Sequence, residues 1–256
     1  MIHPTAIIDP DAQLGSGVTV GPYSIIGAGV TIGDHCDIGP HVVIRGETLI
    51  GEHNRFFQFS SIGEECQDKK YNGEATRLVI GNNNIFREFV TVHRGTIQDQ
   101  SVTKIGNDNL LMNYVHVAHD CIIGNEAIIA NGSQVAGHVH VGDGAIVGGS
   151  CAIHQFCKIG DYAMLGGGTV LFKDVPAFVL VQGNPAKTHG MNYEGMKRRG
   201  YSKEAINMLR RAYRLVYRQS TRLQDALIEL QTWEDESGEI KRFSDSILNS
   251  SRGIVR

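Results

Sequence analysis

Residues 121–160 read CIIGNEAIIANGSQVAGHVHVGDGAIVGGSCAIHQFCKIG, and a large aliphatic residue returns at every sixth position of this stretch. The same spacing extends towards both ends of the chain, with two interruptions. The residues that keep this period are Ile2, Ile8, Leu14, Val20, Ile26, Ile32, Ile38, Ile44, Ile50, Phe56 and Ile62, then Ile80, Phe86 and Val92, then Ile105, Leu111, Val117, Ile123, Ile129, Val135, Val141, Val147, Ile153, Ile159, Leu165 and Leu171. No polar residue breaks any of the three runs, so this repeat decides the fold.

A period of six residues fits neither an α-helix nor a simple hairpin protein. It fits short strands separated by tight corners, where three hexapeptides form one triangular coil and successive coils stack through parallel ladders. Glycine often follows the aliphatic residue, where the backbone leaves the strand conformation. Known hexapeptide-repeat proteins of this kind coil left-handed. We therefore expect a mainly β fold, a left-handed parallel β-helix of hexapeptide repeats with a small C-terminal α-helical domain.

The residue four places after each aliphatic one is mostly small or β-branched, and it should also point inward. Cys36, Cys121, Cys151 and Cys157 occupy this position, which predicts buried core thiols rather than nucleophiles or metal ligands. Only Cys66 lies outside the repeat. An odd number of cysteines in a chain of this length does not indicate a disulfide framework.

Two polar segments interrupt the coils, at about residues 64–77 and 94–104. A corner insertion can be expelled without disturbing the stacking, and such loops often carry function, although a solvated surface loop is the simpler interpretation. The repeat ends near Phe172, and residues 173–190 are expected to form an irregular connection. Helical periodicity follows from Ser202, a plausible N-cap, with further helices expected over Leu223–Trp233 and Ile240–Leu248. Residues 1–190 are thus predicted to form the β-helix and residues 191–256 the helical domain.

Composition excludes several classes of function. The net charge of the 256-residue chain is −3, so the overall balance gives no reason to expect nucleic acid binding. No apolar run approaches the ~20 residues that span a bilayer, and the N-terminus has no secretion signal, which predicts a cytoplasmic protein without a transmembrane segment. Eight lysines and arginines lie between Lys197 and Arg218 with one acidic residue, Glu204. This segment is either a solvated helix face or a site for phosphates or an acidic partner.

Histidines gather in register on one edge of the predicted prism. His119 lies two residues after its aliphatic residue, at a corner, and should point outward. One coil later stand Gly137 and His138, and two coils later stand His154 and Gln155; His116 and Asp120 flank the first level. Histidine suits general-base chemistry near neutral pH, a glycine lets its N–H approach an oxyanion, and a neighbouring carboxylate can orient the imidazole. An isolated outward histidine is usually a surface residue, but clustering by register weakens that interpretation.

Three histidines can also bind zinc, as they do between subunits of the carbonic anhydrases that share this fold. The spacing of His116 and His119 does not exclude a metal. This alternative ranks second because it leaves the loops and the basic segment without a role, and our primary prediction includes no metal and no cofactor.

Seven segments resemble one family of hexapeptide-repeat acyltransferases, the UDP-N-acetylglucosamine O-acyltransferases of lipid A biosynthesis. These segments are CQDKKYNGEATR, TVHRGT, NYVHVAHDC, VAGHVHV, AIHQFC, VQGNPA and MNYEGMKRRGYSKEAI, and they run in order through nearly the whole chain. The resemblance implies transfer of a 3-hydroxyacyl chain from acyl carrier protein to the 3-hydroxyl of UDP-N-acetylglucosamine, the first step of lipid A biosynthesis. It also implies a homotrimer with sites between subunits.

The resemblance also implies a role for each matching residue. His119 corresponds to the general base, Asp120 to its dyad partner, and Gly137 to the oxyanion-stabilising N–H. Substrate-binding positions correspond to Gln67, Asp68 and Lys70 for the acyl 3-hydroxyl, to His116, His138, His154 and Gln155 for the sugar nucleotide, and to Asn192, Glu194, Arg198 and Arg199 for uridine, ribose and phosphates. Gly167 corresponds to the residue that limits acyl length, and a glycine there predicts a longer chain.

Two further alternatives fit less well. The next acyltransferase of the same pathway shares the β-helix but carries an additional N-terminal domain, whereas here the hexapeptides begin at Ile2. A non-catalytic scaffold would not explain the clustered histidines or the Arg198–Arg199 pair.

Overall fold

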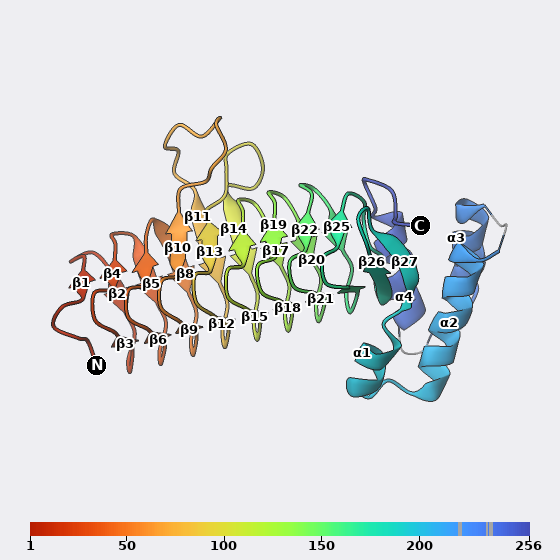
Figure 1. Ribbon diagram of the computed structural model, residues 1–256, viewed down its shortest axis with the longest axis horizontal. Helices are drawn as coiled ribbons and strands as arrows, with labels where there is room; N and C mark the ends of the chain where they lie inside the picture. Colours follow the sequence, from red (N-terminus) through yellow and green to blue (C-terminus); the bar gives the residue numbers. More distant parts are fainter. Residues whose placement is uncertain (220–221, 234, 236–237) are drawn as a thin grey trace.

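The computed structural model shows a three-sided prism of stacked coils that ends in a small group of helices (Figure 1). It describes residues 1–219, 222–233, 235 and 238–256. Three sheets form the sides, each built from every third strand of the repeat, and pairing between coils is parallel. This is the parallel β-helix that the six-residue period predicts, with the left-handed coiling expected from known hexapeptide-repeat proteins.

The strands are short because each corner interrupts the chain after about six residues. One face is a nine-stranded sheet of β1 (Ile7–Ile8), β4 (Ile25–Ile26), β7 (Val43–Ile44), β10 (Ser61–Glu64), β13 (Thr91–His93), β16 (His116–Val117), β19 (Gln134–Val135), β22 (Ala152–Ile153) and β25 (Val170–Leu171). The eight-stranded face contains β2 (Gln13–Leu14), β5 (Val30–Ile32), β8 (Glu47–Ile50), β11 (Arg77–Ile80), β14 (Val102–Ile105), β17 (Ile122–Ile123), β20 (His140–Val141) and β23 (Lys158–Ile159). The ten-stranded face contains β3 (Thr19–Val20), β6 (Asp37–Ile38), β9 (Arg55–Phe56), β12 (Ile85–Phe86), β15 (Leu110–Leu111), β18 (Ile128–Ile129), β21 (Ile146–Val147), β24 (Met164–Leu165), β26 (Val179–Gln182) and β27 (Lys187–Met191).

Inward-pointing side chains fill the prism in the register that the sequence predicts. Val117 pairs with Val135, and Val135 pairs in turn with Ile153, so equivalent residues of successive coils lie above one another. The residues at the small inward position are buried as well. Cys36, Cys121, Cys151 and Cys157 are at most 1% exposed, as predicted, and burial raises the pKa of the Cys121 thiol to about 12. A catalytic thiolate at these positions is therefore unfavourable.

At most corners one residue adopts a left-handed backbone conformation, which allows the chain to turn. Along the edge that joins the ten-stranded face to the nine-stranded face, these corner residues carry stacked rings with centroids 4.7–5.2 Å apart. We call this edge the aromatic edge; it consists of Tyr23, His41, Phe59, Phe89 and Tyr114. Its tyrosine and phenylalanine side chains are 40–60% exposed.

The next edge joins the nine-stranded face to the eight-stranded face, and both insertions leave the prism from it (Figure 1). They connect β10 to β11 and β13 to β14, so residues 65–76 and 94–101 lie outside strands. The predicted bounds, 64–77 and 94–104, were slightly too wide. The parallel ladder continues through Glu64 and Arg77, and Arg77 pairs with Val102.

The expectation of an irregular connection over residues 173–190 was wrong. This segment contains β26 and most of β27, which form an antiparallel hairpin on the end of the ten-stranded face. The hairpin breaks the six-residue period, so the repeat gives no signal for it. The boundary predicted between residues 190 and 191 falls within β27, and the division into two domains remains a prediction.

The helices are α1 (Tyr193–Arg198), α2 (Lys203–Tyr217), α3 (Leu223–Gln231) and α4 (Glu239–Leu248). Ser202 caps α2 as predicted, because its side chain accepts a hydrogen bond from the N–H of Ala205. Leu209, Ala212 and Val216 bury the apolar face of α2. Within the part of the chain that the structure describes, no helix is long and apolar enough to cross a bilayer.

Candidate active site

The candidate site is a pocket of about 760 Å³ on the outside of the nine-stranded face, below the first insertion. The outward residues of β16, β19 and β22 form its floor, and the first insertion contributes one wall. Its lining consists of Gln67, Asp68, Lys69, Lys70, His93, His116, Ala118, His119, Gln134, Ala136, Gly137, Ala152, Ile153 and Gln155. The pocket thus brings together seven residues singled out from the sequence: Gln67, Asp68, Lys70, His116, His119, Gly137 and Gln155.

A carboxylate–imidazole pair lies at the pocket's margin. Nδ1 of His119 is 2.9 Å from Oδ2 of Asp120. Because an ionised carboxylate only accepts hydrogen bonds, Nδ1 carries the proton and donates it, which leaves Nε2 with a free lone pair. The His119 side chain is 12% exposed and that of Asp120 is fully buried, so the pair is held rigidly with one nitrogen accessible.

The second insertion holds the carboxylate of Asp120 in place. The N–H and the hydroxyl of Thr96 both donate to it, at 2.9 Å and 2.6 Å. The N–H of Asp120 donates to the Thr103 hydroxyl at 2.8 Å. Burial opposes ionisation of Asp120, but the hydrogen bonds from His119 and Thr96 outweigh it and lower the pKa of the carboxyl. Asp120 is therefore an anion that orients His119.

Gly137 lies one coil above His119, as the period predicts. A Cβ built at Gly137 would lie 2.7 Å from Nε2 of His119, a distance that real side chains do not adopt. Only glycine therefore lets the backbone and the imidazole approach this closely. The N–H of Gly137 donates to none of the described residues and remains available to a ligand.

Two further histidines, the buried His93 and the half-buried His116, extend the pocket from the dyad. Burial and the neighbouring His119 lower the pKa of His116, whose Nδ1 is 2.8 Å from the Thr91 hydroxyl. His93 meets His116 edge-on with centroids 4.9 Å apart, and burial together with His116 lowers the pKa of His93 to about 4. Nδ1 of His93 has no hydrogen-bond partner among the described residues. Both rings are neutral at pH 7 and can offer hydrogen bonds to an uncharged ligand.

Sequence reasoning missed His93 as a site residue. The second insertion places it 23 positions before His116 in the chain, so a search in steps of 18 residues does not align the two. In the structure Thr91 pairs with His116, which brings His93 next to the pocket. The sequence signal for this is the alignment of the two strands after the residues of the second insertion are left out.

His138 and His154 border the site without lining it. The His138 ring stacks on Phe156 with centroids 4.2 Å apart and meets His119 edge-on at 5.0 Å. His154 is exposed and tilts against Phe172 of the next coil. We define the histidine edge as His119, Asp120, Gly137, His138, Gln155 and Phe156.

The first insertion is pinned to the prism by a buried arginine. Arg94 donates to the carbonyl oxygen of Gly63 at 2.6 Å and to the Tyr71 hydroxyl at 3.1 Å. Asp68 accepts from the N–H of Lys70 at 2.9 Å, which forms a tight turn. These contacts place Asp68 and Lys70 over the pocket, although neither belongs to a strand.

The other predicted site residues do not reach this pocket within one chain. Asn192 caps α1 by accepting from the N–H of Gly195, and Arg199 pairs with Glu126 across the ring of Tyr162. Glu194 pairs with Lys197, and α1, which also contains Arg198, lies at the helical end of the prism, away from the insertions (Figure 1).

Gly167 lies on the turn before β25, one residue before Gly168, which takes the left-handed corner position of the aromatic edge further along the prism. A Cβ there would have ordinary contact, 3.5 Å from the carbonyl oxygen of Gly149. The position can therefore accept a side chain.

The metal alternative can be compared with the geometry. One potential ligand atom from each of His119, Asp120 and His138 lies within 4.8 Å of the others. Asp120 already accepts hydrogen bonds from His119 and Thr96. A cation would have to compete with these bonds, so the donor set favours an oriented imidazole over a metal site.

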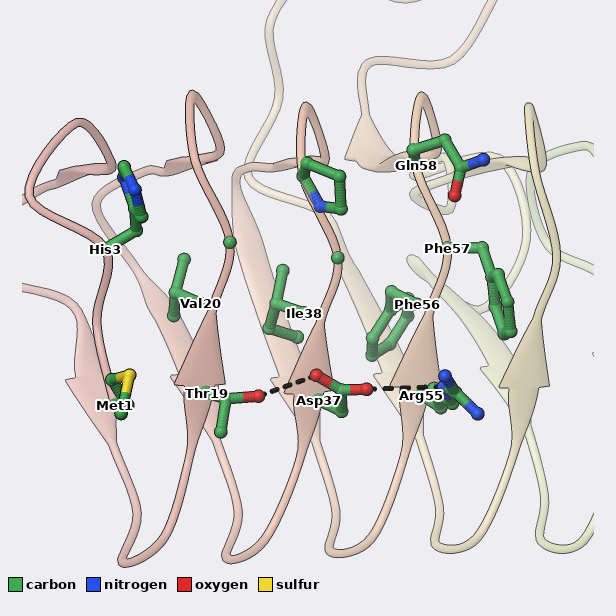
Figure 2. Close-up of a pocket in the computed structure, with 13 residues that line it drawn as sticks. Met1, His3, Thr19, Val20, Asp37, Ile38, Arg55, Phe56, Phe57 and Gln58 are labelled. Atoms are coloured by element: carbon green, nitrogen blue, oxygen red, sulfur yellow. Dashed lines mark hydrogen bonds and ion pairs between the residues drawn. The ribbon is translucent and has the colours of Figure 1, made fainter.

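A second hollow, of about 540 Å³, lies on the ten-stranded face near the N-terminus. Figure 2 shows Thr19, Asp37 and Arg55 in a row across its floor, where Thr19 donates to Asp37 at 2.6 Å and Arg55 pairs with Asp37 at 3.3 Å. These polar side chains are already paired with one another, and the residues that line this hollow include no imidazole–carboxylate pair. The hollow beside His119 is therefore the better candidate for chemistry.

Comparisons with known proteins match both the repeat region and the C-terminal region of the chain. Residues 174–255 match the family described as UDP-N-acetylglucosamine O-acyltransferase, domain 2, and residues 1–34, 11–46 and 103–137 match bacterial transferase hexapeptide repeats. Among solved structures, LpxA from Acinetobacter baumannii has a TM-score of 0.97 at 52% identity, covering 100% of this chain and 99% of that one. A UDP-N-acetylglucosamine acyltransferase from Campylobacter jejuni has a TM-score of 0.95 at 37% identity, with both chains covered completely.

A curated relative from Pseudomonas putida strain F1 is 56% identical over 255 residues, which covers 100% of this chain and 99% of the relative. It is named acyl-(acyl-carrier-protein)–UDP-N-acetylglucosamine O-acyltransferase. Identity at this level over the full length, together with the shared β-helix, shows that the chain belongs to the UDP-N-acetylglucosamine O-acyltransferase family.

Proposed function

We propose that this protein transfers a 3-hydroxyacyl chain from acyl carrier protein to the 3-hydroxyl of UDP-N-acetylglucosamine, the first step of lipid A biosynthesis. The observation that carries the mechanism is the His119–Asp120 pair, whose free Nε2 lies beside the backbone of Gly137 in an open pocket. Family membership supports the substrates, because the relatives' names specify an acyl carrier protein and UDP-N-acetylglucosamine.

In the proposed reaction, Nε2 of His119 takes the proton from the sugar 3-hydroxyl as its oxygen attacks the thioester carbonyl. Asp120 stabilises the imidazolium that forms. The N–H of Gly137 donates to the tetrahedral oxyanion. Collapse of the intermediate breaks the carbon–sulfur bond, and the imidazolium returns its proton to the departing thiolate. The step needs no cofactor because the thioester already carries an activated acyl group.

We propose that the other residues bind the two substrates. Gln67, Asp68 and Lys70 lie over the pocket, where they can recognise the acyl 3-hydroxyl, and His116 and Gln155 line the sugar side. His138 and His154 border that side. Because Asn192, Glu194, Arg198 and Arg199 do not line this pocket, the uridine and phosphate contacts assigned to them would come from a neighbouring subunit.

A homotrimer would supply that neighbour. The aromatic edge supports contact between copies, since a continuous row of exposed rings is costly to leave in water. Cytoplasmic location is also part of the proposal, and it is supported by the five cysteines, all of which are free thiols in the structure.

The test is acyl transfer to UDP-N-acetylglucosamine and to its 3-amino analogue, from carrier proteins loaded with 3-hydroxyacyl chains of graded length. We expect product with the 3-hydroxyl sugar and an optimum at longer chains. Activity with the 3-amino sugar alone would mean that the acceptor is an amino sugar, while the proposed mechanism would still hold. Inactivity with both sugars, together with retention of stoichiometric zinc, would favour the metal alternative.

Substitution at Gly167 sharpens this test, because the position accepts a side chain without backbone strain. Gly167→Met should shift the optimum to shorter chains and leave the KM for the sugar nucleotide unchanged. An unchanged chain-length profile would remove Gly167 from the acyl site.

A further inference from the structure

The second insertion contributes to the histidine edge at two levels. Thr96 reaches Asp120 on the adjacent coil. Three residues further along, Asp99 reaches His138 on the coil after that, with its Oδ2 2.7 Å from Nδ1 of His138. The same eight-residue segment, 94–101, therefore holds the partner of the proposed base and the histidine next to that base.

His138 is fixed on three sides. Phe156 stacks parallel to it at an interplanar angle of 6°, His119 meets it edge-on at 88°, and Asp99 accepts from its Nδ1–H. Its side chain is 11% exposed although the residue lies at a corner. A ring held this way presents one nitrogen, Nε2, towards any ligand, because the bond to Asp99 fixes which nitrogen carries the proton.

We propose that Asp99 is a positioning residue for the acyl transfer, acting through His138. This proposal rests on the proposed function of the site. Asp99 keeps Nδ1 of His138 protonated and occupied, and its negative charge offsets any positive charge on a ring that lies against His119. The edge then contains two carboxylate–imidazole pairs. In the first, Asp120 orients His119 for proton transfer. In the second, Asp99 holds His138, whose ring lies against His119.

The charge arrangement explains why the second pair matters. Ligand atoms of His119, Asp120 and His138 lie within 4.8 Å of one another, so a proton on His138 is felt by the dyad. His119 becomes positive in the proposed transition state, and an uncompensated cation beside it would oppose that step. The Asp99 side chain is 34% exposed, so solvent weakens the effect and we expect a moderate loss, not abolition.

The experiment is a double-mutant cycle between Asp99→Ala and His138→Ala, measured as kcat and KM for both substrates. Asp99→Ala alone should lower kcat roughly tenfold and change KM little. In the His138→Ala background the same substitution should change kcat less than roughly twofold. Asp99→Asn should retain more activity than Asp99→Ala, because its amide oxygen can still accept from Nδ1–H.

The matched control is Gln100→Ala, an exposed neighbour in the same loop whose side chain makes no hydrogen bond or ion pair with the described residues. It should leave kcat unchanged. Equal losses from Asp99→Ala with and without His138, or a loss equal to that of Gln100→Ala, would overturn the proposal.

A second measurement does not depend on turnover. Protein with ring-¹⁵N-labelled histidine should show Nδ1 of His138 protonated, and this signal should shift in Asp99→Ala but not in Gln100→Ala. An unchanged His138 signal in Asp99→Ala overturns the proposal whatever the substrate is. An inactive wild type with the expected shift would instead contradict the proposed function alone.

Discussion

The aromatic edge and the histidine edge share one backbone design and differ in what surrounds it. On both, the corner residue adopts a left-handed conformation and lies above its equivalent in the next coil. On the aromatic edge, the rings stack on one another at centroid distances of 4.7–5.2 Å. On the histidine edge, the imidazoles are held by carboxylates, and a loop from outside the repeat holds one carboxylate and supplies the other.

The difference shows which features of the candidate active site come from the repeat and which come from the insertions. Stacking determines where a corner side chain lies, and it brings His119 to Gly137 without any help from the insertions. Stacking alone does not determine which nitrogen of each imidazole carries the proton, or how the imidazole and carboxylate groups are oriented. Those depend on Thr96 and Asp99, which belong to an insertion that leaves the prism from the histidine edge only.

The largest effect should come from removing the charge that orients the base. Asp120→Asn should lower kcat roughly 10³-fold, because the amide can no longer stabilise the imidazolium and must face the donors of Thr96. Asp108→Asn is the matched control, since Asp108 has the same corner conformation on the third edge and is exposed. Similar rates for the two variants would remove Asp120 from the mechanism.

The close approach of Gly137 to His119 should give the next effect. Gly137→Ala places a methyl group against the imidazole, so we expect kcat to fall roughly 10²-fold through loss of the oxyanion donor and displacement of the base. Gly149→Ala occupies the equivalent position on the other edge, where a Cβ meets only ordinary contacts, 3.4 Å from the Asn131 oxygen. If both substitutions prove harmless, the backbone at Gly137 is not part of the oxyanion site.

His93 makes the site sensitive to acid. Its pKa falls from about 6.5 to about 4 on folding, so between these values the unfolded chain binds a proton that the folded chain does not. The free energy of unfolding should therefore decrease as pH falls from 7 to 4, by up to about 3 kcal/mol from this residue. Urea unfolding at pH 7 and pH 4.5 should show a smaller decrease for His93→Asn than for wild type. His53→Asn, at an exposed corner, should keep the wild-type slope.

The aromatic edge should show the smallest effect, and on stability. Phe89 stacks on Phe59 and on Tyr114, so Phe89→Ala should lower the free energy of unfolding by about 1–2 kcal/mol and weaken association between copies. Sedimentation over a range of concentrations, together with denaturant unfolding, measures both. If this variant has wild-type stability and assembly, the stacked rings contribute to neither the free energy of unfolding nor association between copies.

The sequence predicted the parts of the molecule that follow the period. The prism, the buried cysteines and the stacking of Gly137 over His119 all follow from counting in sixes. His93, Thr96 and Asp99 did not follow, because an insertion of irregular length separates them in sequence from the residues they contact. The β26–β27 hairpin has no hexapeptide signal, and α1 is only six residues long, too short for a helical period to stand out.

The central claim is that His119 is the general base, and its removal tests that claim most directly. Acyl transfer to UDP-N-acetylglucosamine should be compared among wild type, His119→Ala and His53→Ala, the last a histidine at an exposed corner of the third edge. We predict a loss of kcat of roughly 10²-fold or more for His119→Ala and wild-type rates for His53→Ala. Turnover by His119→Ala within a fewfold of wild type would contradict the account.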